Sequence, residues 1–77
     1  MECEVDLNKF TKTDIKVKLY DCVRYTVISF VEYPDEPYLF CKVDGMYSIC
    51  KFITGQSKGE IFHPVAWSDV FLWSENK

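Results

Sequence analysis

The fold of this chain is decided by residues 38–53, which read YLFCKVDGMYSICKFI. Two runs rich in β-branched and aromatic residues flank the dipeptide Asp44-Gly45. Such a dipeptide supplies the positive φ angles that a two-residue type I′ turn requires. The stretch therefore predicts a β-hairpin with Asp44 and Gly45 at its turn.

The position of this turn predicts the register of the hairpin, and the register predicts which side chains share a face. Val43 would pair with Met46, directly across the turn. One face would then carry Leu39, Cys41, Val43, Met46, Ser48, Cys50 and Phe52, and the other Tyr38, Phe40, Lys42, Tyr47, Ile49 and Lys51. The face with the cysteines is the better candidate for the core.

Further strand signals lie on both sides of the hairpin. Residues 15–20 alternate strictly between apolar and polar, which is typical of a half-buried strand. Residues 22–33 form a longer run whose pattern changes near Ser29, and this change predicts a strand that bends there. Short apolar runs predict two more strands at 60–63 and 70–73, and residues 66–69 between them predict a brief helical turn.

Proline, glycine and polar residues separate these strands. The sequence Pro-Asp-Glu-Pro predicts a loop at 34–37, because proline cannot donate to a ladder. Residues 54–59 predict a flexible turn, and the polar segment 1–14 predicts irregular structure or a short strand at 3–7. Five to six short strands without an amphipathic helix predict an all-β single domain over 1–77, built as a small barrel or a rolled antiparallel sheet.

The end of the chain shows a recognisable order of residue types. A glycine, a proline, a turn with an aromatic residue and a Val-x-Leu pair follow one another as Gly59, Pro64, Trp67, Val70 and Leu72. This order resembles the closing segment of SH3-like barrels. The resemblance covers about a fifth of the chain, implies an SH3-like barrel as the fold and carries no ligand residues with it.

Composition limits the size and the class of the protein. Of 77 residues, 48% are hydrophobic and 17% aromatic, enough for one compact core. Nine Lys and Arg against twelve Asp and Glu give a net charge of −3, which fits a soluble protein or an acidic surface facing a basic partner and disfavours uniform binding to nucleic acid. The acidic start and the lack of a long apolar run predict a cytoplasmic protein with no signal peptide and no membrane span.

The sequence contains no recognisable catalytic or metal-binding motif. Its four cysteines are Cys3, Cys22, Cys41 and Cys50, and no two of them form a Cys-x-x-Cys pair. Reduced, structural cysteines are the favoured interpretation, with a disulfide or a metal-binding or redox role as alternatives. Nothing in the sequence places the only histidine, His63, beside a cysteine. We therefore expect no enzyme activity, no cofactor and no metal.

Two surfaces are candidates for binding. If the cysteine-bearing face is core, the opposite face exposes an aromatic stripe, and such stripes mark partner sites. Asp35 and Glu36 in the proline loop would engage basic residues of the partner. The predicted partner site thus consists of Tyr38, Phe40, Tyr47, Ile49, Asp35 and Glu36. The alternative is that the aromatic stripe belongs to the core of a rolled sheet.

The second surface is a basic cluster in the first third of the chain. It consists of Lys9, Lys12, Lys16, Lys18 and Arg24. With nearby aromatic residues these side chains would form a nucleic-acid surface that combines stacking with phosphate contact. The alternative is a set of outward-facing lysines that protect an edge strand from aggregation.

Together these features favour a non-catalytic protein-binding domain. We expect a small acidic inhibitor or adaptor that occludes a functional surface of its partner, with a basic nucleic-acid-binding protein as one candidate partner. Compact acidic domains of this kind resemble the host-directed or anti-defence proteins that phages and mobile elements encode. An edge strand offers a further route to a partner's sheet or to a homodimer. The alternative function is nucleic-acid binding through the basic cluster.

Overall fold

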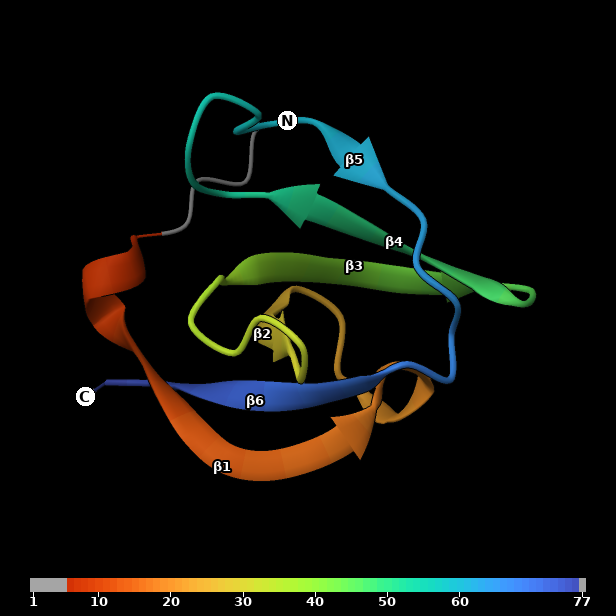
Figure 1. The fold of residues 1–77 in the computed structure, drawn as a ribbon, viewed down its shortest axis with the longest axis horizontal. Coiled ribbons are helices and arrows are strands. Elements are labelled where there is room, and N and C mark those ends of the chain that lie inside the picture. Colours follow the sequence, from red (N-terminus) through yellow and green to blue (C-terminus); the bar gives the residue numbers. More distant parts are fainter. Residues whose placement is uncertain (1–5, 77) are drawn as a thin grey trace.

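The computed structural model describes residues 6–76 and shows an all-β fold (Figure 1). The strands are β1 (Phe10–Lys18), β2 (Thr26–Phe30), β3 (Tyr38–Asp44), β4 (Tyr47–Phe52), β5 (Ile61–Phe62) and β6 (Asp69–Glu75). They form one antiparallel sheet in the order β1-β6-β2-β3-β4-β5. Two short 3₁₀ turns, η1 (Leu7–Lys9) and η2 (Leu19–Asp21), flank β1. Within residues 6–76 no helix has the length and apolar character needed to cross a membrane.

The segment between β5 and β6 draws the two sides of the sheet together. Val65 forms a bridge with Tyr47 at the start of β4. The amide of Tyr20 in η2 donates to the carbonyl of Ala66 at 3.0 Å, and the amide of Ala66 donates to the carbonyl of Met46 at 2.9 Å. The same segment is thus bonded both to the hairpin and to the turn that follows β1. The sheet is rolled, and β1 and β6 lie opposite β4 and β5 in Figure 1.

The hairpin forms at the predicted place, but its turn lies one residue later than predicted. Asp44 pairs with Tyr47, so Gly45 and Met46 are the turn residues. Gly45 has a φ of +68°, whereas Met46 is not among the residues with positive φ. Glycine at the first central position is typical of a type II′ turn, which explains why Asp44 stays in the strand.

A β-bulge changes the hairpin register a second time. Phe40 pairs with Cys50 and Lys42 with Ile49, so Cys41 is an extra residue on β3. The predicted pairs are therefore wrong, and the two predicted faces hold only between the turn and the bulge, where Val43 lies opposite Ser48. Phe40 and Cys50 lie opposite each other and share one face, because opposed residues of an antiparallel pair point the same way.

Both faces of the central strands are covered by apolar side chains. One buried cluster consists of Leu19, Ile28, Phe40, Cys50 and Val70, and a second of Val27, Leu39 and Ile53. Neighbours such as Leu39 and Phe40 belong to different clusters because successive strand side chains point to opposite faces. The strand predicted over 22–33 is confirmed only over Thr26–Phe30, a range that includes Ser29.

The first strand is longer than predicted and is bulged. It begins at Phe10, and its register against β6 shifts between Lys12 and Lys16. Ile15 lies within this irregular stretch and is 56% exposed, so its predicted place on the buried face is wrong. Of the segment 1–14, residues 1–5 lie outside the described part, and Leu7–Lys9 forms the turn η1.

One partly buried side-chain hydrogen bond joins β6 to β2. The indole N–H of Trp73 donates to the hydroxyl of Ser29 at 3.0 Å, and Ser29 has no exposed surface. We expect Trp73→Phe to lower the free energy of unfolding by about 1–2 kcal/mol, since the Ser29 hydroxyl loses this donor. Urea unfolding followed by circular dichroism measures this. Ser29→Ala should lower the free energy of unfolding less in the Trp73→Phe variant than in the wild type, because the hydrogen bond is already absent. If the two substitutions had strictly additive effects, the Trp73–Ser29 hydrogen bond would be contradicted.

Candidate partner-binding site

Four aromatic rings meet on one face of the sheet, and we call them the aromatic floor. They are Phe30 of β2, Tyr38 of β3, Phe52 of β4 and Phe62 of β5, and all are half-buried. The Tyr38 ring centroid lies 5.5 Å from that of Phe30, 5.4 Å from that of Phe52 and 5.0 Å from that of Phe62. Tilted and edge-on contacts at these distances are favourable between aromatic rings. Four strands are thus joined at a firm, partly exposed surface.

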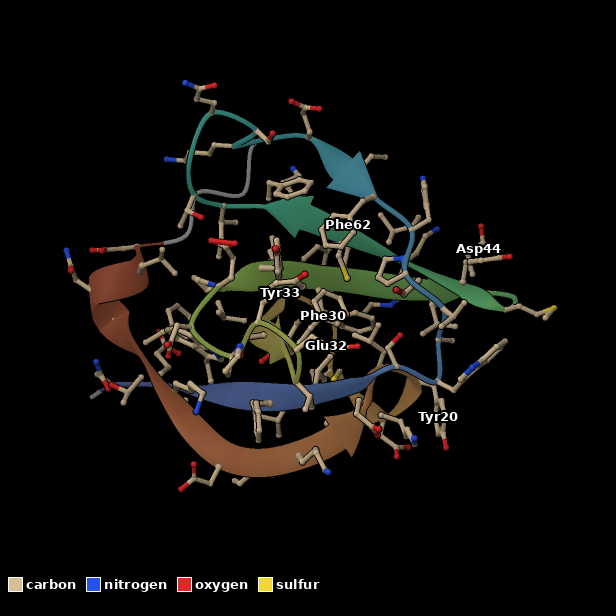
Figure 2. The ribbon with its side chains drawn as sticks, viewed as in Figure 1. Tyr20, Phe30, Glu32, Tyr33, Asp44 and Phe62 are labelled. Atoms are coloured by element: carbon tan, nitrogen blue, oxygen red, sulfur yellow. The ribbon has the colours of Figure 1, made fainter. Side chains whose placement is uncertain are left out.

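Residues 31–36, between β2 and β3, lie beside this floor, and we call them the acidic turn. Its backbone is held by hydrogen bonds from the Tyr33 amide to the Phe30 carbonyl at 3.0 Å and from the Glu36 amide to the Tyr33 carbonyl at 3.1 Å. The Tyr33 side chain is 68% exposed. Figure 2 shows Tyr33 and Glu32 close to Phe30, with Phe62 beyond them. The predicted loop at 34–37 is confirmed, since the structure places no strand there.

An open cleft separates the acidic turn from the segment before β6, and we call it the main cleft. Its volume is about 910 Å³, and its lining includes Phe30, Glu32 and Tyr33 on one side and Pro64, Trp67 and Asp69 on the other. A smaller hollow of about 210 Å³ lies at the other end of the turn, lined by Glu36, Tyr38, Phe52 and residues 54–57. The acidic turn therefore separates two concave surfaces.

A buried serine anchors the second wall of the main cleft. The hydroxyl of Ser48 donates to the carbonyl of Pro64 at 2.9 Å, and the amide of Ser48 donates to the same oxygen at 2.7 Å. Trp67, three residues further on, is 50% exposed. The position of this indole thus depends on a backbone segment that is bonded to β4, which keeps the wall in place without covering the ring.

Some charged side chains around the site form an ion pair, and others do not. Lys18 and Asp69, both in the lining of the main cleft, form an ion pair with 2.8 Å between Nζ and Oδ1. Their mutual hydrogen bond raises the pKa of Lys18 and lowers the pKa of Asp69. The acidic turn adds the exposed carboxylates Glu32, Asp35 and Glu36. Burial first, then the nearby Glu36 and Tyr33, raise the pKa of Tyr38, so the floor and the turn share one environment.

The structure groups only some of the predicted partner-site residues. Tyr38 and Glu36 line the same hollow, and Asp35 lies in the same turn. Phe40, in contrast, is 2% exposed and belongs to the core, so the prediction of one exposed stripe is wrong. Tyr47 is 52% exposed at the hairpin end, and its strand neighbour Ile49 is half-buried. The cause is the Cys41 bulge, which places Phe40 opposite the buried Cys50.

The sequence interpretation missed Tyr33 and Trp67, the two most exposed rings of the main cleft. Tyr33 was assigned to a strand, although Pro34 directly after it signals the start of a loop. Trp67 was assigned to a helical turn, and its exposure has no signal in the sequence. Only the fold brings residues 32–33 and 64–69 to opposite sides of one cleft.

The predicted basic cluster is spread over two parts of the sheet. Three of its lysines, Lys12, Lys16 and Lys18, lie within β1. The Lys12 ammonium is 4.6 Å from the Phe71 ring centroid. Lys18 is neutralised by Asp69, and Lys9 lies in η1. Arg24 precedes β2, which is separated from β1 by β6. The surface that could contact phosphates is therefore reduced mainly to Lys9, Lys12 and Lys16.

The thiols of Cys22 and Cys50 are held in their protonated form. Burial raises the pKa of Cys50 to about 12 and that of Cys22 to about 11. A nucleophilic or metal-binding cysteine has the opposite shift, because the thiolate is the reactive form. Within residues 6–76, no three His, Cys, Asp or Glu side chains are grouped so that they could hold a metal ion.

No protein-family model, curated protein or solved structure matches this chain.

Proposed function

We propose that this chain is a non-catalytic protein-binding domain and that the main cleft and the acidic turn form its binding surface. One observation carries the proposal: a single cleft is lined by an exposed tyrosine and an exposed tryptophan from two separate segments, beside carboxylates that form no ion pair. Tyrosine and tryptophan are enriched among the residues that dominate binding energy, since they offer large contact areas at a low entropy cost. Isolated exposed rings are ordinary, but two in one cleft favour a binding site.

The geometry supports a mechanism of occlusion. The aromatic floor and the bonded segment 64–68 hold both walls of the cleft, so little ordering is needed on binding. Tyr33 and Trp67 would anchor the partner, and the carboxylates of the acidic turn would increase its association rate. A small inhibitor or adaptor acts in this way, as does a host-directed protein of a phage or mobile element. We propose such a role in the cytoplasm.

Affinity capture from a nuclease-treated lysate tests this function. We expect the wild-type chain to retain a protein in stoichiometric amount and the Tyr33→Ala/Trp67→Ala variant to retain at least about tenfold less. The matched control is Ile15→Ala/Ile61→Ala, which removes two apolar side chains of similar exposure outside the site (56% and 54%) and should bind as the wild type does. Equal capture by both double variants would refute the proposed surface.

One observation favours the alternative of nucleic-acid binding. Lys12 lies over the Phe71 ring, and Lys16 pairs with Phe71 across the β1–β6 ladder. A base that stacked there would meet ammonium groups. Recovery of only nucleic acid, or of proteins that nuclease treatment releases, would support this alternative and contradict the protein-binding function.

A further inference from the structure

We propose that the partner presents an extended, arginine-bearing segment to this surface. The segment would lie in the main cleft, with its guanidinium groups on the acidic turn. This inference rests on the proposed function and specifies the chemistry of the partner. It is carried by three features of the site: its charge, its exposed rings and its open shape.

The negative charge of the acidic turn favours a cationic partner. Lys18 and Asp69 neutralise each other, which leaves three carboxylates on five consecutive residues of the turn, Glu32, Asp35 and Glu36. In the described part of the chain none of these three takes part in an ion pair. Like charges held this close repel one another, and a cationic partner relieves that repulsion. A phosphate backbone would increase it, so the observations favour a protein over nucleic acid.

The exposed rings favour arginine over lysine. Tyr33 is adjacent in sequence to Glu32 and lines the same cleft, so a ring face and a carboxylate are available at one place. A guanidinium group stacks on an aromatic face and pairs with a carboxylate through two parallel hydrogen bonds. An ammonium group is a compact, strongly hydrated charge that cannot make the bidentate contact. Trp67 offers a second, half-exposed ring on the opposite wall.

The shape of the site fits a chain segment. The main cleft lies between two stretches of backbone and opens to solvent, and the acidic turn carries the lining on toward the smaller hollow at Glu36 and Tyr38. Small-molecule sites bury most of their ligand. An open surface that continues around a turn instead suits an extended peptide with cationic side chains at several points.

Fluorescence anisotropy at low salt tests this chemistry directly. The probe is a short fluorescein-labelled peptide in which arginine alternates with alanine, and the comparison probes are its lysine counterpart and a labelled single-stranded DNA. We expect the arginine peptide to bind about threefold or more tightly than the lysine peptide. We expect no saturable binding of the DNA at the same concentrations. Equal affinity for both peptides, or no binding of either, would overturn the inference.

A pair of charge-matched variants locates the binding. Glu32→Gln/Asp35→Asn/Glu36→Gln should weaken the arginine peptide about tenfold, as expected for the loss of three exposed ion pairs. Asp14→Asn/Asp44→Asn/Glu75→Gln changes the net charge equally at three exposed carboxylates outside the site and should weaken it less than about twofold. Equal losses in both variants would show attraction to the net charge alone and would overturn the inference.

These outcomes separate the inference from the function on which it rests. A lysate partner that depends on Tyr33 and Trp67 but tolerates the neutralised turn would overturn the arginine proposal and leave the protein-binding function in place. If the capture experiment yields no such partner, the proposed function itself fails, whatever the peptides do.

Discussion

Phe40→Ala is expected to destabilise the folded protein by about 3–5 kcal/mol, the usual cost of removing a buried phenylalanine ring. The ring is 2% exposed and is packed in a cluster with Leu19, Ile28, Cys50 and Val70. Small domains have a free energy of unfolding near the low end of about 5–15 kcal/mol, so this variant should be largely unfolded near physiological temperature. Urea unfolding followed by circular dichroism gives the difference directly.

Tyr47→Ala provides the matched control, since Tyr47 is an aromatic residue of the same hairpin and is 52% exposed. Its effect should stay within about 0.5 kcal/mol, which is typical of surface positions. The two residues were predicted to share one exposed face, and the structure assigns them to the core and to the surface. Similar, small effects of both substitutions would contradict the observed register.

The hairpin illustrates what local sequence can and cannot predict. Turn-forming residues between two apolar runs predict that a hairpin exists, and it does. Its register depends on whether Asp44-Gly45 or Gly45-Met46 forms the turn, and this difference shifts every cross-strand pair by two residues without changing which residues share a face. The Cys41 bulge, which no residue type in the run marks, shifts the register by one residue and so changes which side chains share a face beyond it. Burial therefore differs from the prediction although the strands are correct.

Part of the candidate site comes from residues close together in the sequence, and part from residues that only the fold brings together. Asp35, Glu36 and Tyr38 lie within four consecutive residues, and their proximity was predictable from the loop alone. The pairing of Tyr33 with Trp67 across the main cleft depends on how residues 64–68 connect the hairpin to η2. Backbone contacts between segments so far apart in sequence leave no periodic pattern, so this half of the site could be found only from the fold.

Alkaline pH is expected to destabilise the protein through the Cys50 thiol. Cys50 has no exposed surface, and burial raises its pKa from 9.0 to about 12. In the unfolded chain the thiol loses its proton near pH 9, whereas in the folded protein it stays protonated well above that pH. The unfolded state therefore binds fewer protons, and the free energy of unfolding falls with rising pH. The contribution of Cys50 is fully present below pH 9 and is lost toward pH 12, at about 1.4 kcal/mol per pH unit.

The Cys50→Ala variant isolates this contribution from the tyrosines and lysines that titrate in the same range. Its free energy of unfolding should be lower than that of the wild type at neutral pH, because a buried side chain is truncated. Between pH 9 and about pH 11 it should decline less steeply, so the two curves converge by about 2–3 kcal/mol. Urea unfolding under reducing conditions at several pH values measures both slopes. Parallel curves would mean that the thiol ionises in the folded state at its ordinary pKa, in conflict with a buried cysteine opposite Phe40. Convergence would show that the Cys50 thiol is buried in the core in solution.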